Sequence, residues 1–151
     1  MVIHLIRHLK PDASSGQLNL EVACVFTSPL ARAHRTARLF FPQHEIQLVP
    51  ELAEISMGEW EGRAWEEIEV AWPELARQKL NDWFAVTPPG GEAWRDFEAR
   101  VTAAWARIRG APSPCAVVAH AGTNFVLAKL ATGHELSQPQ AHGEVITLEI
   151  R

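Results

Sequence analysis

The sequence predicts an α/β fold, a three-layer α/β/α sandwich built on a mainly parallel sheet. Short apolar runs rich in β-branched residues alternate along the chain with longer segments whose apolar residues recur at helical spacing. Strands that alternate with helices form parallel sheets covered on both faces. The 151 residues, 47% of them hydrophobic, also match the size of one globular domain with its own core. We therefore expect a single domain over residues 1–151.

Each expected element is bounded by polar, proline or glycine residues. The candidate buried strands are Met1–Ile6, Val22–Thr27, Ile46–Val49 and Ala116–Ala119, with Glu144–Ile150 as an alternating edge strand. The expected helices are Leu30–Phe40, Trp65–Leu80, Trp94–Ile108 and Asn124–Ala131. Ser28 and Thr123 are placed to cap two of these helices, and Pro88–Gly91 is the clearest loop.

Side chains that can bind an anion follow three of the apolar runs. Arg7 and His8 follow the first run, Ser28 and Arg32 follow the second, and His120 follows the run that ends at Ala119. Ligands of open parallel sheets bind outside the carboxyl ends of the strands. Two histidines and two arginines are therefore expected to converge on one rim and form an anion site.

Composition and charge exclude several other classes of protein. The formal net charge of -4 leaves no excess of basic residues for a nucleic-acid partner. No apolar run approaches the roughly 20 residues that span a bilayer, so we expect no membrane partner and a cytoplasmic protein. His4 and His8 stand four apart, a spacing that suits a metal on a helix, but this stretch is an expected strand and has no carboxylate or cysteine nearby to complete a set. We therefore predict no bound metal.

Several short motifs occur in the order, and at the strand-to-loop positions, of a known family. The main ones are Leu5–His8, Thr27–Ala33 and Val118–Gly122; Leu52–Ile55, Gly58–Gly62 and Pro89–Glu92 add to them. The set resembles the signatures of the histidine phosphatase superfamily, whose fold is phosphoglycerate-mutase-like. The resemblance runs from the first expected strand to the last expected helix. It implies phosphoryl transfer without metal or cofactor.

The resemblance also assigns roles to individual residues. His8 is the implied nucleophile, since a neutral imidazole can attack phosphorus through one nitrogen while the other donates a hydrogen bond. Arg7 and Arg32 are expected to hold phosphate oxygens through charge-assisted hydrogen bonds. His120, protonated against the phosphate dianion, and the backbone N–H of Ala121 are expected to donate further hydrogen bonds. Arg35 and Arg38 lie on the same expected helix as Arg32 and are its alternatives.

Glu54 is the proton donor that the resemblance implies. It is expected to protonate the leaving oxygen and later to act as the base for water. Glu51, Glu59 and Glu61 lie within the same eleven residues, and Glu59 is the first alternative.

The sequence departs from the family after the nucleophile. Leu9 stands where the family usually has glycine, and it is expected to narrow the approach of this loop to the phosphate. Pro11 gives the loop a likeness to the α-ribazole phosphatase branch. In the family, a polar residue of this loop contacts the phosphate. Three residues could take that role here: Ser14, Ser15 and Asn19.

Only 13 residues separate His8 from Val22, too few for the family's usual helix. One face of the sheet is therefore expected to be thinly covered, which favours a homodimer. Residues 60–94 are expected to form a lid-like insertion over the phosphate. The insertion contains Trp60, Trp65, Trp72 and Trp83. Most of these four are expected to pack inward, and one or two could line the leaving-group pocket.

These expectations combine into a functional prediction. We expect a phosphomonoester hydrolase that acts on a small phosphorylated metabolite through a phosphohistidine intermediate. α-Ribazole phosphate is one candidate substrate. The alternatives are a phosphoglycerate-type mutase and a non-catalytic anion-binding relative.

Overall fold

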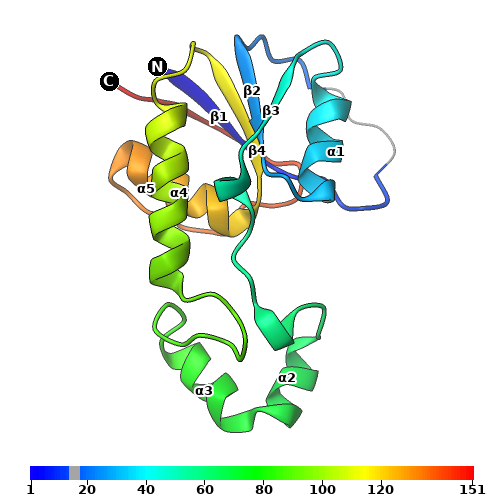
Figure 1. The fold of residues 1–151 in the computed structure, drawn as a ribbon, viewed down its shortest axis with the longest axis vertical. Coiled ribbons are helices and arrows are strands. Elements are labelled where there is room, and N and C mark those ends of the chain that lie inside the picture. Colours follow the sequence, from blue (N-terminus) through cyan, green and yellow to red (C-terminus); the bar gives the residue numbers. More distant parts are fainter. Residues whose placement is uncertain (14–17) are drawn as a thin grey trace. The chain divides into compact units, whose positions relative to one another are not determined.

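The computed structural model describes residues 1–13 and 18–151. It has the predicted α/β architecture, in which helices lie on both sides of one sheet (Figure 1). The strands are β1 (Val2–Arg7), β2 (Cys24–Thr27), β3 (Ile46–Leu48), β4 (Cys115–Ala119) and β5 (Val145–Glu149). The helices are α1 (Ala31–Phe40), α2 (Trp65–Ala71), α3 (Pro73–Asn81), α4 (Trp94–Ile108) and α5 (Ala121–Thr132). Two short 3₁₀ turns, Pro50–Leu52 and Gly58–Trp60, complete the elements.

The strand order is β3-β2-β4-β1-β5, with four parallel strands and β5 antiparallel at the edge. Arg7 is in register with Ala119, and Thr27 is in register with Val118. The carboxyl ends of β1, β2 and β4 therefore lie side by side. The residues that follow these three strands are brought to one edge of the sheet, as predicted for the anion site.

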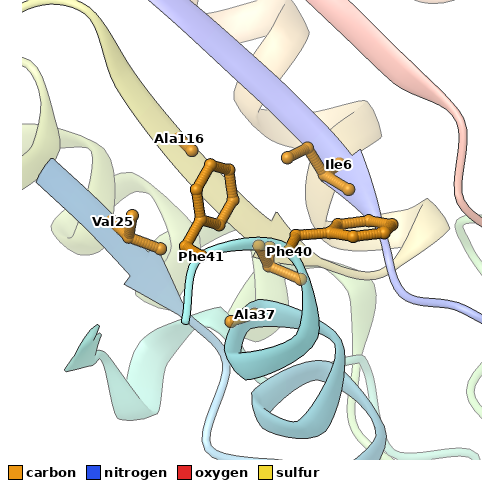
Figure 2. Packing of buried hydrophobic residues seen from close by; sticks show 7 residues of the cluster. Ile6, Val25, Ala37, Phe40, Phe41 and Ala116 are labelled. Atoms are coloured by element: carbon orange, nitrogen blue, oxygen red, sulfur yellow. The ribbon is translucent and has the colours of Figure 1, made fainter. Parts of the chain in front are cut away.

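The buried side chains of the central strands alternate between the two faces of the sheet. On one face Ile6, Val25 and Val118 pack against Phe40 and Phe41 at the end of α1 (Figure 2). Burying a phenylalanine side chain is worth about 1.5–3 kcal/mol, so this contact holds α1 firmly against the sheet.

The opposite face of the sheet is covered equally well. Leu5, Phe26 and Val117 alternate with the residues of the first face, and none is more than 3% exposed. Burial on both faces makes three layers, as expected from the sequence.

The expectation of a thinly covered face is wrong. The segment between β1 and β2 has no helix among its described residues, but it supplies Leu18, Leu20 and Val22, which pack against the cluster under α1. These residues thus cover the face that the absence of a helix was expected to leave bare. The homodimer stays a prediction, but a thinly covered face no longer supports it.

The expected helix Trp65–Leu80 is two helices. α2 ends at Ala71 and α3 begins at Pro73. Proline lacks the N–H of an interior helical residue and its ring clashes with the preceding turn, but it fits the first position of a helix. The apolar spacing continues across Pro73, so periodicity alone does not separate the two helices.

The two expected N-caps are also wrong. The N-cap residues are Leu30 for α1 and His120 for α5, so α5 begins at Ala121, three residues earlier than expected. Ser28 Oγ still accepts a hydrogen bond from the Leu30 N–H, at 3.2 Å. Thr123 lies inside the first turn of α5, where its hydroxyl donates to the Leu52 carbonyl oxygen at 3.1 Å.

The described chain divides into two compact units, residues 1–54 with 100–151, and residues 55–99. The second unit has its own small core, in which Trp60, Ile68 and Ala76 are buried and Trp65 and Trp72 pack partly buried around them. Trp83 is the exposed one of the four, with 42% of its surface accessible. The lid-like role of residues 60–94 stays a prediction.

The loop at Pro88–Gly91 forms as expected. Gly58 has a φ of +57°, and a Cβ there would lie 2.3 Å from the Pro89 carbonyl oxygen, so only glycine fits against this loop. None of the helices in residues 1–13 and 18–151 combines the length and the apolar character that a membrane crossing needs.

Candidate active site

His8 stands directly after β1 and is held in one tautomer. Its Nδ1 lies 2.7 Å from the Leu9 carbonyl oxygen, so Nδ1 carries the proton that is donated and Nε2 keeps a lone pair. Burial lowers the pKa of His8 below its usual 6.5, and the nearby charges of Arg32, His142 and Arg7 lower this pKa further. The hydrogen bond to the Leu9 carbonyl oxygen raises the pKa but does not offset these effects. At neutral pH the ring is therefore neutral and can act as a nucleophile.

His120 lies beside His8 at the end of β4. The two ring centroids are 5.2 Å apart, and the rings meet edge to face. His120 is 1% exposed, and its Nε2 lies 2.8 Å from Ser28 Oγ. Burial, followed by nearby positive charge, chiefly that of Arg32, lowers the pKa of His120 to about 3. In the free protein His120 is neutral, so the protonated form expected from the sequence needs a bound anion.

Arg7 is the last residue of β1, and the loop before β5 holds its guanidinium group. Nη1 donates to the Gln140 carbonyl oxygen at 2.6 Å, and Nη2 lies 3.3 Å from His142 Nε2. The buried Nε has no hydrogen-bond partner among the described residues. Arg7 thus keeps one buried donor available.

The structure distinguishes Arg32 from its neighbours on α1. The positive charge of Arg32 contributes to the lowered pKa values of both His8 and His120, which places its guanidinium group near the two rings. Arg35 instead donates to the carbonyl oxygens of Pro11 and Ala13 and so braces the loop after β1. Arg38 makes no contribution of this kind to either histidine.

Glu54 comes to the same part of the molecule, at the start of α5. Its Oε2 accepts the Gly122 N–H at 2.9 Å, and its Oε1 lies 3.5 Å from Thr123 Oγ1. The exposed N–H groups of a helix N-terminus favour a carboxylate at this position. The carboxylate therefore contacts the chain two residues after His120 and is held there by a backbone N–H.

The other glutamates of the acidic segment have other surroundings. Glu59 and Glu61 are exposed in the unit formed by residues 55–99. Glu61 Oε1 accepts the Met57 N–H at 2.7 Å within that unit. Among the four glutamates, the described hydrogen bonds tie Glu54 to the chain segment that carries His120.

Leu9 packs away from the position expected of it. Its side chain lies against the core cluster under α1, and its N–H donates to Thr36 Oγ1 at 2.9 Å. A Cβ on Gly143 would come within 2.9 Å of Leu9 Cδ2. Of the three candidates for a polar phosphate contact, Ser14 and Ser15 lie outside the described residues, and Asn19 is exposed.

The sequence does not point to two residues that shape the site. Gln140 and His142 contact Arg7 from the loop before β5, whereas Ser28, which the sequence places on the same rim, bonds His120. His142 also lies beside His8, with 5.3 Å between ring centroids. No local pattern marks Gln140 or His142, because their contacts join positions more than 130 residues apart.

Ala121, the expected backbone donor, is the first residue of α5. Its N–H stays a predicted phosphate contact. The described residues contain no group of three or more His, Cys, Asp or Glu side chains arranged to hold a metal ion.

Several known proteins resemble this chain in sequence. Adenosylcobalamin/alpha-ribazole phosphatase from Salmonella typhimurium is 33% identical over 117 residues, which cover 72% of this chain and 56% of that protein. The protein of the same name from Escherichia coli is 35% identical over 86 residues, or 56% of this chain and 42% of that protein. The chain thus spans about half the length of these curated relatives, and less of others.

Solved structures share the fold. The alpha-ribazole phosphatase from Shigella flexneri superposes with a TM-score of 0.86 at 24% identity and covers 100% of this chain and 91% of that one. A phosphoglycerate mutase from Bacillus anthracis superposes with a TM-score of 0.74 at 16% identity and covers 97% and 86%. At these identities the likeness concerns the fold alone, which is phosphoglycerate-mutase-like as predicted.

A family model matches most of the chain. The model of the histidine phosphatase superfamily (branch 1) matches residues 15–149. Arg32, Glu54 and His120 lie inside the matched range, and Arg7 and His8 lie just before it. The family expected from the motifs is confirmed: the chain belongs to branch 1 of the histidine phosphatase superfamily.

Proposed function

We propose that this protein is a metal-independent phosphomonoester hydrolase that works through a phosphohistidine on His8. One observation carries the proposal. Two buried nitrogens have no hydrogen-bond partner among the described residues: His120 Nδ1, on the ring next to His8, and Nε of Arg7, whose charge acts on His8. Buried polar groups in proteins are normally bonded. A phosphoryl group, with several acceptor oxygens, would satisfy both nitrogens next to a ready nucleophile.

In the first step the lone pair on His8 Nε2 attacks phosphorus. A P–N bond forms and the bond from phosphorus to the leaving oxygen breaks. Protonated Glu54 gives its proton to that oxygen, so the product leaves as a neutral alcohol. Arg7 and Arg32 bind the equatorial oxygens, where negative charge is concentrated in the transition state.

In the second step water regenerates the free enzyme. The Glu54 carboxylate takes a proton from a water molecule as its oxygen attacks the phosphohistidine. The P–N bond breaks, its electron pair returns to His8 Nε2, and inorganic phosphate leaves. His120, protonated once the dianion is bound, donates to a phosphoryl oxygen in both steps.

The substrate that we propose is a small phosphorylated metabolite. Two relatives above 30% identity carry alpha-ribazole phosphatase in their names, which supports α-ribazole phosphate as the first compound to try. The formal charge of -4 makes a polyanionic nucleic-acid substrate a poor fit.

The test is turnover of a chromogenic phosphomonoester in excess chelator, by the native protein and by His8→Ala. We expect chelator to leave the rate unchanged, vanadate to inhibit, and His8→Ala to lose several orders of magnitude. His134, exposed in a loop, supplies the matched control, because His134→Ala should turn over normally. A strict need for added metal, or native activity in His8→Ala, would refute the proposal.

A further inference from the structure

The guanidinium group of Arg7 is held from one side by a single loop. Nη1 donates to the Gln140 carbonyl oxygen at 2.6 Å and Nη2 meets His142 Nε2 at 3.3 Å. Arginine nitrogens only donate hydrogen bonds. His142 Nε2 must therefore be the acceptor in this pair, which makes His142 neutral with its proton on Nδ1.

The surroundings of His142 favour the neutral form. The charged or titratable groups that face it are Arg7, His8 and Lys10. Partial desolvation, then the charges of Arg7 and Lys10, lower the pKa of His142 below its usual value. An exposed histidine next to cations thus serves as a hydrogen-bond acceptor.

The loop that carries His142 is anchored to β1. Gln140 is 1% exposed, and its Nε2 donates to the carbonyl oxygens of Leu5 and Glu144, each at 2.7 Å. Its Oε1 accepts the Asn124 side-chain N–H at 2.8 Å. A fully bonded buried side chain of this kind fixes the position of its backbone.

Backbone bonds complete the anchor. The Gly143 N–H donates to the Arg7 carbonyl oxygen at 2.9 Å, and the Arg7 N–H donates to the Glu144 carbonyl oxygen at 3.1 Å. The loop and the arginine therefore keep one relative position. Two of the three guanidinium nitrogens are occupied by the loop, and Nε is left for a ligand.

We infer that His142 is a positioning residue: together with the Gln140 carbonyl group it fixes the Arg7 guanidinium in the orientation that binds the phosphoryl group. This inference rests on the proposed function. A side chain held in its binding orientation loses less conformational entropy when the ligand arrives. The loop before β5, which none of the recognised motifs includes, then contributes to phosphate affinity without touching phosphate.

Two substitutions at one position separate an acceptor role from a purely structural one. His142→Phe keeps a flat ring but removes the acceptor, whereas His142→Gln places an amide oxygen near the position of Nε2. A hydrogen bond to a charged group corresponds to roughly tenfold in affinity or more. We expect His142→Phe to weaken binding of inorganic phosphate, measured by calorimetry, by roughly tenfold. The same His142→Phe substitution should raise KM by a similar factor and change kcat less. His142→Gln should restore most of the phosphate affinity and most of the native KM.

A double-mutant cycle tests whether His142 acts through Arg7. In an Arg7→Lys background the guanidinium fork is gone, so His142→Phe should cause little further loss of phosphate affinity. His134→Phe, an exposed histidine on a different loop, is the matched control and should bind phosphate like the native protein. Thermal unfolding of each variant reports on folding.

Two results would overturn the inference. One is native phosphate affinity in His142→Phe; the other is an equal loss in the native and Arg7→Lys backgrounds. The calorimetric measurement does not require turnover. A protein that binds phosphate in a His142-dependent way but hydrolyses nothing would refute the proposed function and leave this inference standing.

Discussion

The carboxylate of Glu54 accepts a hydrogen bond from the backbone N–H of Gly122, with 2.9 Å between Oε2 and the nitrogen. The bond joins the acid to the first turn of α5, directly after His120. Arg100 holds the other side of this segment, donating to the carbonyl oxygens of Glu51, Ala53 and Glu54. The proposed acid is thus fixed through its side chain and through its backbone.

The first prediction follows from the proposed role of this carboxylate. Glu54→Gln should slow hydrolysis of a phosphate ester with a poor alkoxide leaving group far more than that of an activated phenol, because only the alkoxide needs a proton in the transition state. General acid catalysis contributes typically about 10²–10⁴-fold, a gap that steady-state kinetics resolves. Glu59→Gln and Glu61→Gln are the controls and should show little dependence on leaving group. If Glu59→Gln shows the dependence instead, the acid has been assigned to the wrong residue.

The second prediction concerns the glycine that faces this acid. A Cβ on Gly122 would lie 2.5 Å from Glu54 Oε1, closer than such atoms approach in proteins, so Gly122→Ala should displace the carboxylate. We expect the same selective loss with the alkyl ester as in Glu54→Gln, and little extra loss when the two changes are combined.

Gly110→Ala is the matched control for this prediction. The nearest atom to a Cβ there is the Arg107 carbonyl oxygen, at 3.8 Å, so the added methyl group fits. Unfolding curves should show that Gly122→Ala is folded. If Gly122→Ala lowers the hydrolysis rate equally for both kinds of ester, the substitution disturbs more than the acid.

The third prediction concerns pH and stability. The pKa of folded His120 is about 3, while an unfolded histidine titrates near 6.5. Between these values the unfolded chain binds the extra proton, so the free energy of unfolding should fall as the pH drops from 6.5 towards 3, and this contribution is fully present above pH 6.5. The slope from one such group is at most about 1.4 kcal/mol per pH unit.

Chemical denaturation at several pH values measures this slope. His120→Gln keeps a polar side chain that does not titrate, so its stability should depend less on pH in this window than that of the native protein. His134→Gln removes an exposed histidine and should follow the native curve. Identical slopes for all three proteins would show that His120 is not held neutral by the fold.

The sequence predicts most of the fold, because its dominant signals are local. β-Branched runs, helical spacing and the order of the elements identify every strand of the sheet. The errors occur where a single residue overrides periodicity: Pro73 divides one expected helix, and the chain turns into α5 directly after His120. Periodicity does not report such points, although proline by itself is a recognisable signal.

The sequence predicts part of the arrangement of the candidate site, for a physical reason. Arg7 ends β1, and His8 and His120 directly follow β1 and β4, whose carboxyl ends the parallel sheet brings together. Gln140 and His142 contact Arg7 only because of the path that the loop before β5 takes. No short sequence motif predicts that path. The same holds for Leu9, whose side chain turns into the core.

The central claim is that His8 carries the phosphoryl group, and the nature of the covalent intermediate tests it most directly. Brief exposure to labelled substrate, followed by rapid denaturation and peptide mapping, should place label on His8. A phosphoramidate survives alkali and is lost in acid, and no label should appear in His8→Ala. Label that survives acid, or that maps to a serine or aspartate, would contradict the account.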